Sequence, residues 1–126
     1  MMLQEAGVDV TAARVAVLGY AYLENSDDTR DSPSAALVAR LRELGAEMMI
    51  HDPFVAEYRG DLEEIVRGCD AMVVMVAHDA YRALDLARLR NLARTPVLVD
   101  GRRVVDCGHA EAAGWQVYTV GVGSLS

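Results

Sequence analysis

The sequence predicts an α/β fold with a mostly parallel sheet of about five strands and helices on both of its faces. Short apolar runs alternate with amphipathic helical patterns along most of the chain. Several of these runs are continuously apolar, which is typical of strands that are covered on both sides. Parallel strands need right-handed crossover connections, and these place the helices in layers above and below the sheet. The expected architecture therefore has three layers.

The first strand and the first helix carry clear boundaries. The first strand is expected at residues 14–18, where an arginine precedes four consecutive apolar residues. Leucines at helical spacing predict a helix over residues 33–44. Ser32 is suited to the N-cap, and Pro33 to the first helical position, where its missing N–H is tolerated. Gly45 is expected to end the helix as a C-cap.

The middle of the chain predicts two further strands separated by a short helix. Residues 48–51 form the second strand, which ends at the turn pair Asp52-Pro53. A short helix is expected at 61–67, followed by Gly68. Residues 71–77 are the most apolar stretch of the chain. We therefore expect them to form a central strand.

The last part of the chain continues the same alternation. Residues 79–92 predict one or two helical segments, and residues 96–99 a fourth strand with proline at its first position, where a missing donor is tolerated. A short helix is expected at 106–113 and a final strand at 115–120. These elements complete the alternation of strand and helix that predicts the parallel sheet.

The length of 126 residues and the 52% hydrophobic composition indicate one globular domain, expected at residues 14–126. Residues 1–13 differ from it and resemble the end of a helix followed by a linker. The net charge of -7 argues against partners such as nucleic acid or a membrane surface, because both require a basic face. All 12 basic residues are arginines. Schiff-base and lysine-dependent phosphate chemistry are therefore excluded.

The sequence gives no indication of export or of metal binding. No apolar run approaches the roughly 18 to 20 residues of a membrane span, and the amino terminus lacks a basic region followed by an apolar core. We expect the protein to be cytoplasmic. Cys69 and Cys107 lack CxxC spacing, so we expect two reduced structural thiols and neither a metal site nor a disulfide.

Four polar segments are expected at one edge of the sheet, because ligands of open parallel sheets bind outside the carboxyl ends of the strands. They are residues 19–30, Asp52-Pro53, Ala77-His78 and 100–102. Within the first of them Arg30 stands just before the helix start. We expect an anion to meet its guanidinium together with free backbone N–H groups of that helix.

Several of these residues have a simpler interpretation. Arg30 could pair with the neighbouring aspartates, and such surface ion pairs contribute little. Asp27 and Asp28 are adjacent, and their side chains are expected to form turns and caps, or to orient Arg30, and not to share a metal. The pair Arg102-Arg103 is either a solvated turn or a second phosphate contact.

The histidines and the glycines exclude two common kinds of site. No HxH or HExxH spacing accompanies His51, His78 or His109, so we expect structural or solvent-facing histidines. Gly19-Tyr20-Ala21 lies where a dinucleotide fold has GxGxxG, but the second and third glycines are absent. The chain therefore lacks an ordinary NAD-binding fingerprint.

Residues 15–33 carry a resemblance to a known family. Gly-Tyr-Ala-Tyr followed by Asn-Ser-Asp-Asp-Thr-Arg-Asp-Ser-Pro resembles the C-terminal UDP-binding domain, a Rossmann-like domain, of the UDP-glucose/GDP-mannose dehydrogenase family. The likeness continues through His-Asp-Pro-Phe-Val at 51–55 and Val-Asp-Gly-Arg-Arg-Val-Val-Asp at 99–106. The form Tyr-Leu-Glu-Asn-Ser is most similar to the archaeal-type UDP-N-acetyl-D-mannosamine and UDP-N-acetylglucosamine dehydrogenases.

The resemblance implies an NAD-dependent, two-step oxidation of the C6 alcohol of UDP-N-acetylmannosamine or a related UDP-hexose to the uronate. It implies that Tyr22, Leu23 and Arg102 contact the UDP-sugar and that Arg30 reaches the NAD. Many members have lysine where this chain has Leu23. Backbone or apolar contact is expected to replace that charge.

The resemblance also implies partners for this domain. In the family, the NAD-binding glycine motif and the nucleophilic cysteine lie in the N-terminal and central domains, and neither Cys69 nor Cys107 has a matching context. We therefore expect no catalytic residue and no activity in the chain alone. The resemblance also implies a homodimer or larger assembly in the full enzyme. The alternative is a free-standing nucleotide-sugar-binding regulatory or interaction module without oxidoreductase activity. A small independent Rossmann enzyme is a third possibility, but it would need the dinucleotide fingerprint.

Overall fold

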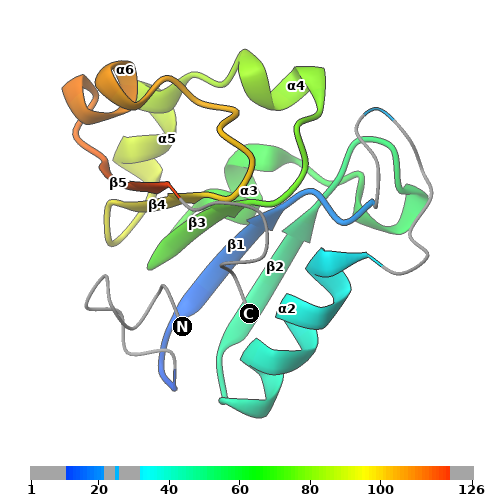
Figure 1. The fold of residues 1–126 in the computed structure, drawn as a ribbon. Coiled ribbons are helices and arrows are strands. Elements are labelled where there is room, and N and C mark those ends of the chain that lie inside the picture. Colours follow the sequence, from blue (N-terminus) through cyan, green and yellow to red (C-terminus); the bar gives the residue numbers. More distant parts are fainter. Residues whose placement is uncertain (1–10, 22–24, 26–31, 120–126) are drawn as a thin grey trace.

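The computed structural model describes residues 11–21, 25 and 32–119. They form a five-stranded parallel sheet in the order β2-β1-β3-β4-β5 (Figure 1), which confirms the predicted fold class. The strands are β1 (Arg14–Leu18), β2 (Glu47–His51), β3 (Ala71–Val74), β4 (Val97–Asp100) and β5 (Gln116–Thr119). The chain passes from β1 to β2 in one direction and then places β3 on the other side of β1. This reversal creates a topological switch point between β1 and β3.

The strand β3 is central, as predicted, but shorter than expected. It ends at Val74, whereas the apolar run continues to Ala77. Val74 pairs with Leu18, the last residue of β1, so the sheet offers no further neighbour strand on that side. The Met75 N–H still donates to the Leu18 carbonyl at 2.9 Å, and the chain then leaves the sheet. The remaining apolar residues lie beyond the carboxyl edge.

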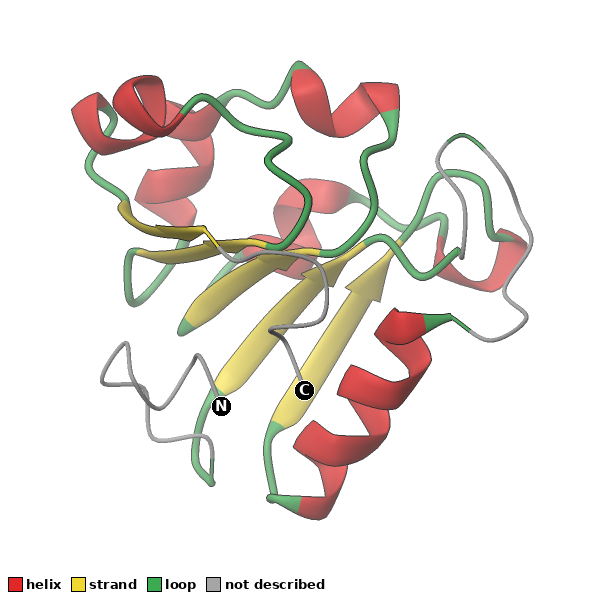
Figure 2. Ribbon diagram, in the orientation of Figure 1, coloured by secondary structure: helices red, strands yellow, loops and turns green. Residues whose placement is uncertain are grey.

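The helices lie in two layers (Figures 1 and 2). One face of the sheet carries α2 (Pro33–Glu43). The opposite face carries α3 (Leu62–Val66), α4 (Asp79–Arg82), α5 (Leu86–Leu92) and α6 (Cys107–Ala112). The region 79–92 therefore contains two helices, and Asp85 caps the second of them. A short 3-10 helix, η1 (Ala56–Tyr58), was not anticipated from the sequence.

Two apolar clusters hold these layers together, one on each face of the sheet. Side chains alternate along β1, so Val15 and Val17 pack toward α2, while Ala16 and Leu18 pack toward the other helices. All four side chains are fully buried. This burial on both faces explains why the strand has no polar alternation.

The ends of α2 agree with the expected caps, with one adjustment. Ser32 is the N-cap and Pro33 the first helical residue. The C-cap is Leu44, and Gly45 follows it at φ +93°. The Gly45 and Ala46 N–H groups bond to carbonyls of the last turn, which is a Schellman arrangement and favours glycine after the cap.

A buried carboxylate holds the amino edge of the sheet. Asp70 accepts hydrogen bonds from the Arg14 backbone N–H at 3.0 Å, from the Thr95 hydroxyl at 2.9 Å and from two nitrogens of Arg94 at 2.8 and 2.6 Å. Burial opposes ionisation, but these donors outweigh it and hold the pKa of Asp70 below its usual value. Asp70 therefore fixes the starts of β1 and β3.

None of the helices in the described part of the chain is long and apolar enough to span a bilayer.

Candidate functional site

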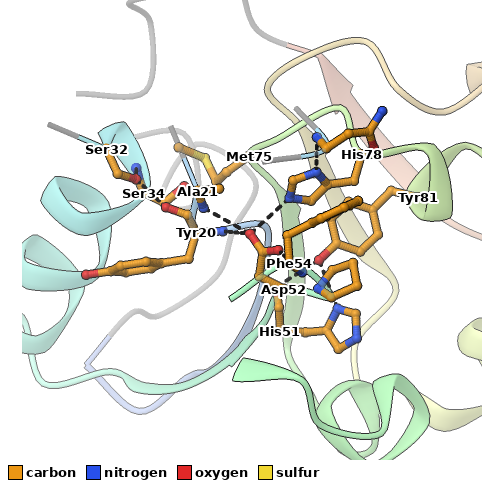
Figure 3. Close-up of polar contacts among 12 residues, drawn as sticks. Tyr20, Ala21, Ser32, Ser34, His51, Asp52, Phe54, Met75, His78 and Tyr81 are labelled. Carbon is orange, nitrogen blue, oxygen red and sulfur yellow. Dashed lines mark hydrogen bonds and ion pairs between the residues drawn. The ribbon is translucent and has the colours of Figure 1, made fainter. Parts of the chain in front are cut away.

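Asp52 links the carboxyl ends of three strands at the switch point (Figure 3). It follows β2, and its Oδ2 accepts hydrogen bonds from the Tyr20 N–H at 2.8 Å and the Ala21 N–H at 2.9 Å, just beyond β1. The same oxygen accepts a bond from His78 Nε2 at 2.9 Å, just beyond β3. Oδ1 accepts the Phe54 N–H at 2.8 Å. A carboxylate with four donors is well satisfied although it is completely buried.

His78 extends this network to the loop after β1. Its Nδ1 accepts the Asn25 backbone N–H at 2.7 Å. Because Nδ1 accepts, the ring proton is assigned to Nε2, which donates to Asp52. The Phe54 ring lies against the imidazole, with centroids 4.8 Å apart, and His78 has no exposed surface. The buried ring therefore bridges Asp52 and Asn25.

Asn25 has the backbone conformation that this contact needs. Its φ is +53°, in the left-handed region that asparagine tolerates better than most residues. Its side-chain Oδ1 accepts the Asp79 N–H at 3.1 Å, at the start of α4. The loop after β1 is thus attached to the segment after β3 by both its backbone and a side chain.

The protonation of Asp52 follows from these contacts. Burial raises the free energy of the carboxylate, but hydrogen bonds from the Ala21 N–H, His78, Tyr20 and Phe54 N–H groups more than offset it. The pKa of Asp52 consequently lies below its usual value. The group is an anion at neutral pH and accepts from all its donors.

His51 and Tyr81 form a second buried polar group next to the first. The Tyr81 hydroxyl donates to the His51 carbonyl at 2.8 Å and lies 2.8 Å from His51 Nδ1, which must therefore carry a proton. Burial is the main reason that the pKa of His51 is lowered. Burial likewise raises the pKa of Tyr81 above its usual value. Both residues are structural, as expected for His51.

Gly19 has a packing role at the switch point. Its φ is +99°, and a Cβ at this position would lie 2.7 Å from Val76 Cβ and 2.9 Å from the Val76 nitrogen. No side chain fits there, because the backbone after β1 passes directly against the segment after β3. The glycine therefore permits close packing of these two chain segments.

The expectation of free backbone N–H groups at the start of α2 is wrong for its first turn. The Ser32 hydroxyl accepts the Ser34 N–H at 3.1 Å and the Ala35 N–H at 3.4 Å, and Pro33 has no N–H. The Ser32 hydroxyl also donates to the Tyr20 carbonyl at 2.6 Å. The N-cap thus joins α2 to the end of β1 and occupies the donors that an anion was expected to use.

Arg102 lies at the same edge, after β4. Its backbone N–H donates to Asp100 Oδ1 at 3.1 Å, and the Val105 N–H donates to Oδ2 of the same buried carboxylate at 2.9 Å, which folds the turn. Its Nε donates to the Met75 carbonyl at 3.1 Å, just beyond β3. Among the described residues, no acceptor is hydrogen-bonded to its Nη atoms. The neighbouring Arg103 is exposed, at φ +55°.

Three of the expected site residues, Tyr22, Leu23 and Arg30, lie outside the described residues, as do Asp27 and Asp28. The described flanks of the loop, Ala21, Asn25 and Ser32, nevertheless converge on the edge that also holds Asp52 and His78. Both cysteines are free thiols; Cys69 is buried and Cys107 exposed. Burial raises the pKa of Cys69 to about 11.

The UDP-binding domain of the UDP-glucose/GDP-mannose dehydrogenase family matches residues 16–107, well over half of the chain. The chain belongs to this family. The match runs from β1 to the start of α6 and so includes the carboxyl ends of β1, β2, β3 and β4. The family resemblance expected from residues 15–33 is thereby confirmed.

Individual members of the UDP-glucose/GDP-mannose dehydrogenase family are similar to the chain. UDP-glucose 6-dehydrogenase YwqF of Bacillus subtilis is 32% identical, covering 89% of this chain and 28% of that protein. UDP-N-acetyl-D-mannosamine dehydrogenase of Pyrococcus horikoshii is 32% identical, over 82% of this chain and 25% of that protein. The NDP-N-acetyl-D-galactosaminuronic acid dehydrogenase structure from Methanosarcina mazei superposes with a TM-score of 0.84 at 33% identity, over 94% of this chain and 26% of that one. The chain thus spans roughly a quarter of the length of these relatives.

The Asp52–His78 pair is the part of the UDP-binding domain's edge that sequence reasoning missed. His78 was expected to be structural or solvent-facing, and it is structural. Asp52 was expected to form a turn at the same edge of the sheet as His78, but no bond between the two was expected. Both residues directly follow predicted strands of a parallel sheet, which places them at one edge, but their contact depends on the strand order β2-β1-β3, which the sequence does not give.

Proposed function

We propose that this chain is the UDP-sugar-binding domain of an NAD-dependent UDP-sugar 6-dehydrogenase. The observation that carries the proposal is the family match over residues 16–107, which covers the strand ends where a parallel sheet binds its ligands. Relatives named UDP-glucose and UDP-N-acetyl-D-mannosamine dehydrogenases support UDP-linked hexoses as the substrate class. The Pyrococcus relative supports UDP-N-acetylmannosamine as one member of this class. We propose that the reaction takes place in the cytoplasm.

Tyr22, Leu23 and Arg102 are the residues we propose to contact the UDP-sugar. The Arg102 guanidinium is anchored through Nε to the Met75 carbonyl, which fixes its plane, and within residues 11–21, 25 and 32–119 no acceptor is bonded to its two terminal nitrogens, which we propose meet an anionic group. A diphosphate is the anionic part of a UDP-sugar. Leu23 would contribute through its backbone or by apolar contact, since it has no charge.

The described residues do not fit the main site of a dinucleotide. Gly19 packs against Val76, and the first donors of α2 bond to Ser32, so neither is available to a pyrophosphate. We therefore propose that NAD is held mainly by another domain of the enzyme, with Arg30 reaching it from this one. When bound, NAD would accept the hydride that is removed from the substrate. The nucleophilic thiol would also come from elsewhere, since Cys69 is buried with a raised pKa and the exposed Cys107 lacks the sequence context of the family's nucleophile.

Calorimetric titration of the chain with UDP tests the proposed binding. We expect weak but saturable binding, lowered about tenfold or more by Arg102→Ala, because a charge-assisted contact to the diphosphate is lost. Arg88→Ala is the matched control, since Arg88 is an exposed arginine of α5 that pairs with Glu63 on α3. Absence of UDP binding by the folded wild-type chain, up to millimolar ligand, would contradict the proposal.

An activity assay tests the proposal that NAD binding and the nucleophilic thiol come from other domains of the enzyme. The purified chain should produce no NADH from NAD and a UDP-sugar, because neither the dinucleotide site nor the nucleophile would be supplied by it. Measurable turnover would show that this domain carries chemistry of its own. Addition of a separate polypeptide with the NAD-binding and central domains should restore the reaction.

A further inference from the structure

We infer that the buried Asp52–His78 pair is a positioning element that holds the chain on both sides of residues 22–24 and thereby sets the substrate-contacting edge. This inference rests on the proposed function, because it assigns the pair a role in holding Ala21 and Asn25, which flank the proposed UDP-sugar contacts in the sequence. Neither Asp52 nor His78 is exposed, so both act through the backbone that they bind. They are positioning residues and do not touch the substrate.

Asp52 fixes the chain before residues 22–24. Gly19 directly follows β1, and its N–H still donates a hydrogen bond to β2, to the His51 carbonyl at 2.7 Å. The next two N–H groups, of Tyr20 and Ala21, both turn to one oxygen of Asp52. Two consecutive amides that converge on one anion form a turn and not an extended strand. The direction in which the chain leaves the sheet is therefore set by this carboxylate.

His78 fixes the chain after residues 22–24. Its Nδ1 accepts the Asn25 N–H at 2.7 Å, while Nε2 donates to the same oxygen of Asp52 that holds Ala21. The amides of Ala21 and Asn25 are thus connected through two side chains that are themselves hydrogen-bonded. Because the Asp52 and His78 side chains are fully buried, water does not easily reach their bonding atoms, so losing one of these bonds leaves an unsatisfied group.

A comparison within the molecule separates positioning from plain stabilisation. Asp70 is also a buried carboxylate with four hydrogen bonds, but it lies at the amino edge and binds Arg14, Arg94 and Thr95. Asp52 and Asp70 should therefore affect folding to a similar degree. Only Asp52 binds the backbone that leads into the proposed substrate site. Asp70→Asn is consequently a matched control for Asp52→Asn.

The test measures UDP affinity by calorimetry at a temperature where all variants are folded. We expect Asp52→Asn to weaken binding at least tenfold and Asp70→Asn to stay within about twofold of wild type. The amide of His78→Gln reaches the position of the imidazole Nε2, which bonds to Asp52, and the amide of His78→Asn reaches the position of Nδ1, which bonds to Asn25, so each variant keeps only one of the two bonds. Because positioning requires both bonds, each variant should weaken binding.

A second pair of variants at the exposed Asn25 avoids any loss of the core. Alanine disfavours a φ of +53°, whereas glycine adopts it without strain. Both variants lose the side-chain bond to the Asp79 N–H. Asn25→Ala should therefore bind UDP more weakly than Asn25→Gly if the backbone contact to His78 matters. Equal affinities would overturn the inference even if the buried variants failed to fold.

Amide hydrogen exchange supplies a readout without ligand. In the wild-type chain the Ala21 and Asn25 amides should be protected, and His78→Gln should lose protection at Asn25 at least tenfold while the β1 amides stay protected. Rapid exchange of Asn25 in wild type would overturn the inference directly. Wild-type affinity in Asp52→Asn and both His78 variants would also overturn it and leave the proposed function standing. Failure of the wild-type chain to bind UDP would instead reject the proposed function, and the role of the pair with it.

Discussion

The Asp52 carboxylate accepts a hydrogen bond from His78 Nε2 at 2.9 Å, and neither side chain has any exposed surface. The two residues are 26 positions apart in the sequence. They meet because β2 and β3 lie on either side of β1 and run in the same direction, so their carboxyl ends share one edge. This pair links the strand ends at which UDP-sugar binding is proposed.

The stability of the chain should decrease on mild acidification because of His51. Its pKa in the folded state lies below the ordinary value of 6.5, mainly through burial. As the pH falls, the unfolded chain takes up the proton first, so the contribution is complete above about pH 6.5 and is lost as the pH falls through the folded pKa. Urea unfolding at several pH values should show this loss. In His51→Asn, which cannot titrate, the decrease in this range should be smaller.

Asp52 should contribute to a second, more acidic loss of stability. Its folded pKa lies below the ordinary value of 3.8, so the stabilisation is present above about pH 3.8 and is lost as the pH falls through the folded pKa. Chemical unfolding between pH 5 and pH 2 should be less pH-dependent in Asp52→Asn than in wild type. An unchanged slope would mean that the carboxylate gains no net hydrogen-bond stabilisation on folding.

Gly19→Ala should be strongly destabilising, by about 2 to 4 kcal/mol. The new Cβ would lie 2.9 Å from the Val76 backbone nitrogen, and alanine would have to adopt the positive φ of this position. Gly45→Ala is the matched control. It has a similar φ of +93°, but its nearest contact would be 3.5 Å away. The free energies of unfolding of the two variants should differ by the cost of the clash. Similar losses would argue against close packing between the ends of β1 and β3.

Ser32→Ala should cost more than an ordinary N-cap substitution, which is about 1 kcal/mol. The Ser32 hydroxyl caps α2 and also donates to the Tyr20 carbonyl at 2.6 Å. Asp61→Ala removes the exposed N-cap of α3, where the side chain accepts one N–H at 3.1 Å. Thermal unfolding should show a larger decrease for Ser32→Ala. The reverse order would indicate that the bond to Tyr20 contributes little.

The two thiols should differ in reactivity. Cys107 is exposed, whereas Cys69 is fully buried and has a pKa raised to about 11, so it is rarely a thiolate at neutral pH. A thiol reagent at pH 8 should modify one cysteine rapidly in the native protein and both in denaturant. Loss of the fast phase in Cys107→Ser would identify the residue. Rapid modification of Cys69 in native protein would contradict its burial.

The sequence alone determined the order of the strands and α-helices along the chain, because apolar runs, helical spacing and caps are local patterns. The continuous run in β1 predicted a strand covered on both faces, and Ser32-Pro33 predicted the start of α2. Boundaries that depend on neighbours were less accurate. β3 stops at Val74 because β1 has ended, and no pattern within residues 71–77 contains that information.

For the site, too, the sequence determined some features and the tertiary structure the others. The sequence placed four polar segments at one edge, since parallel strands end together, and local motifs carried the family resemblance. Only the tertiary structure decided that Asp52 and His78 meet, that Ser32 occupies the first donors of α2, and that Gly19 is needed for packing against Val76. Each of these depends on distances between residues far apart in the chain, which the relative placement of β1, β2 and β3 fixes.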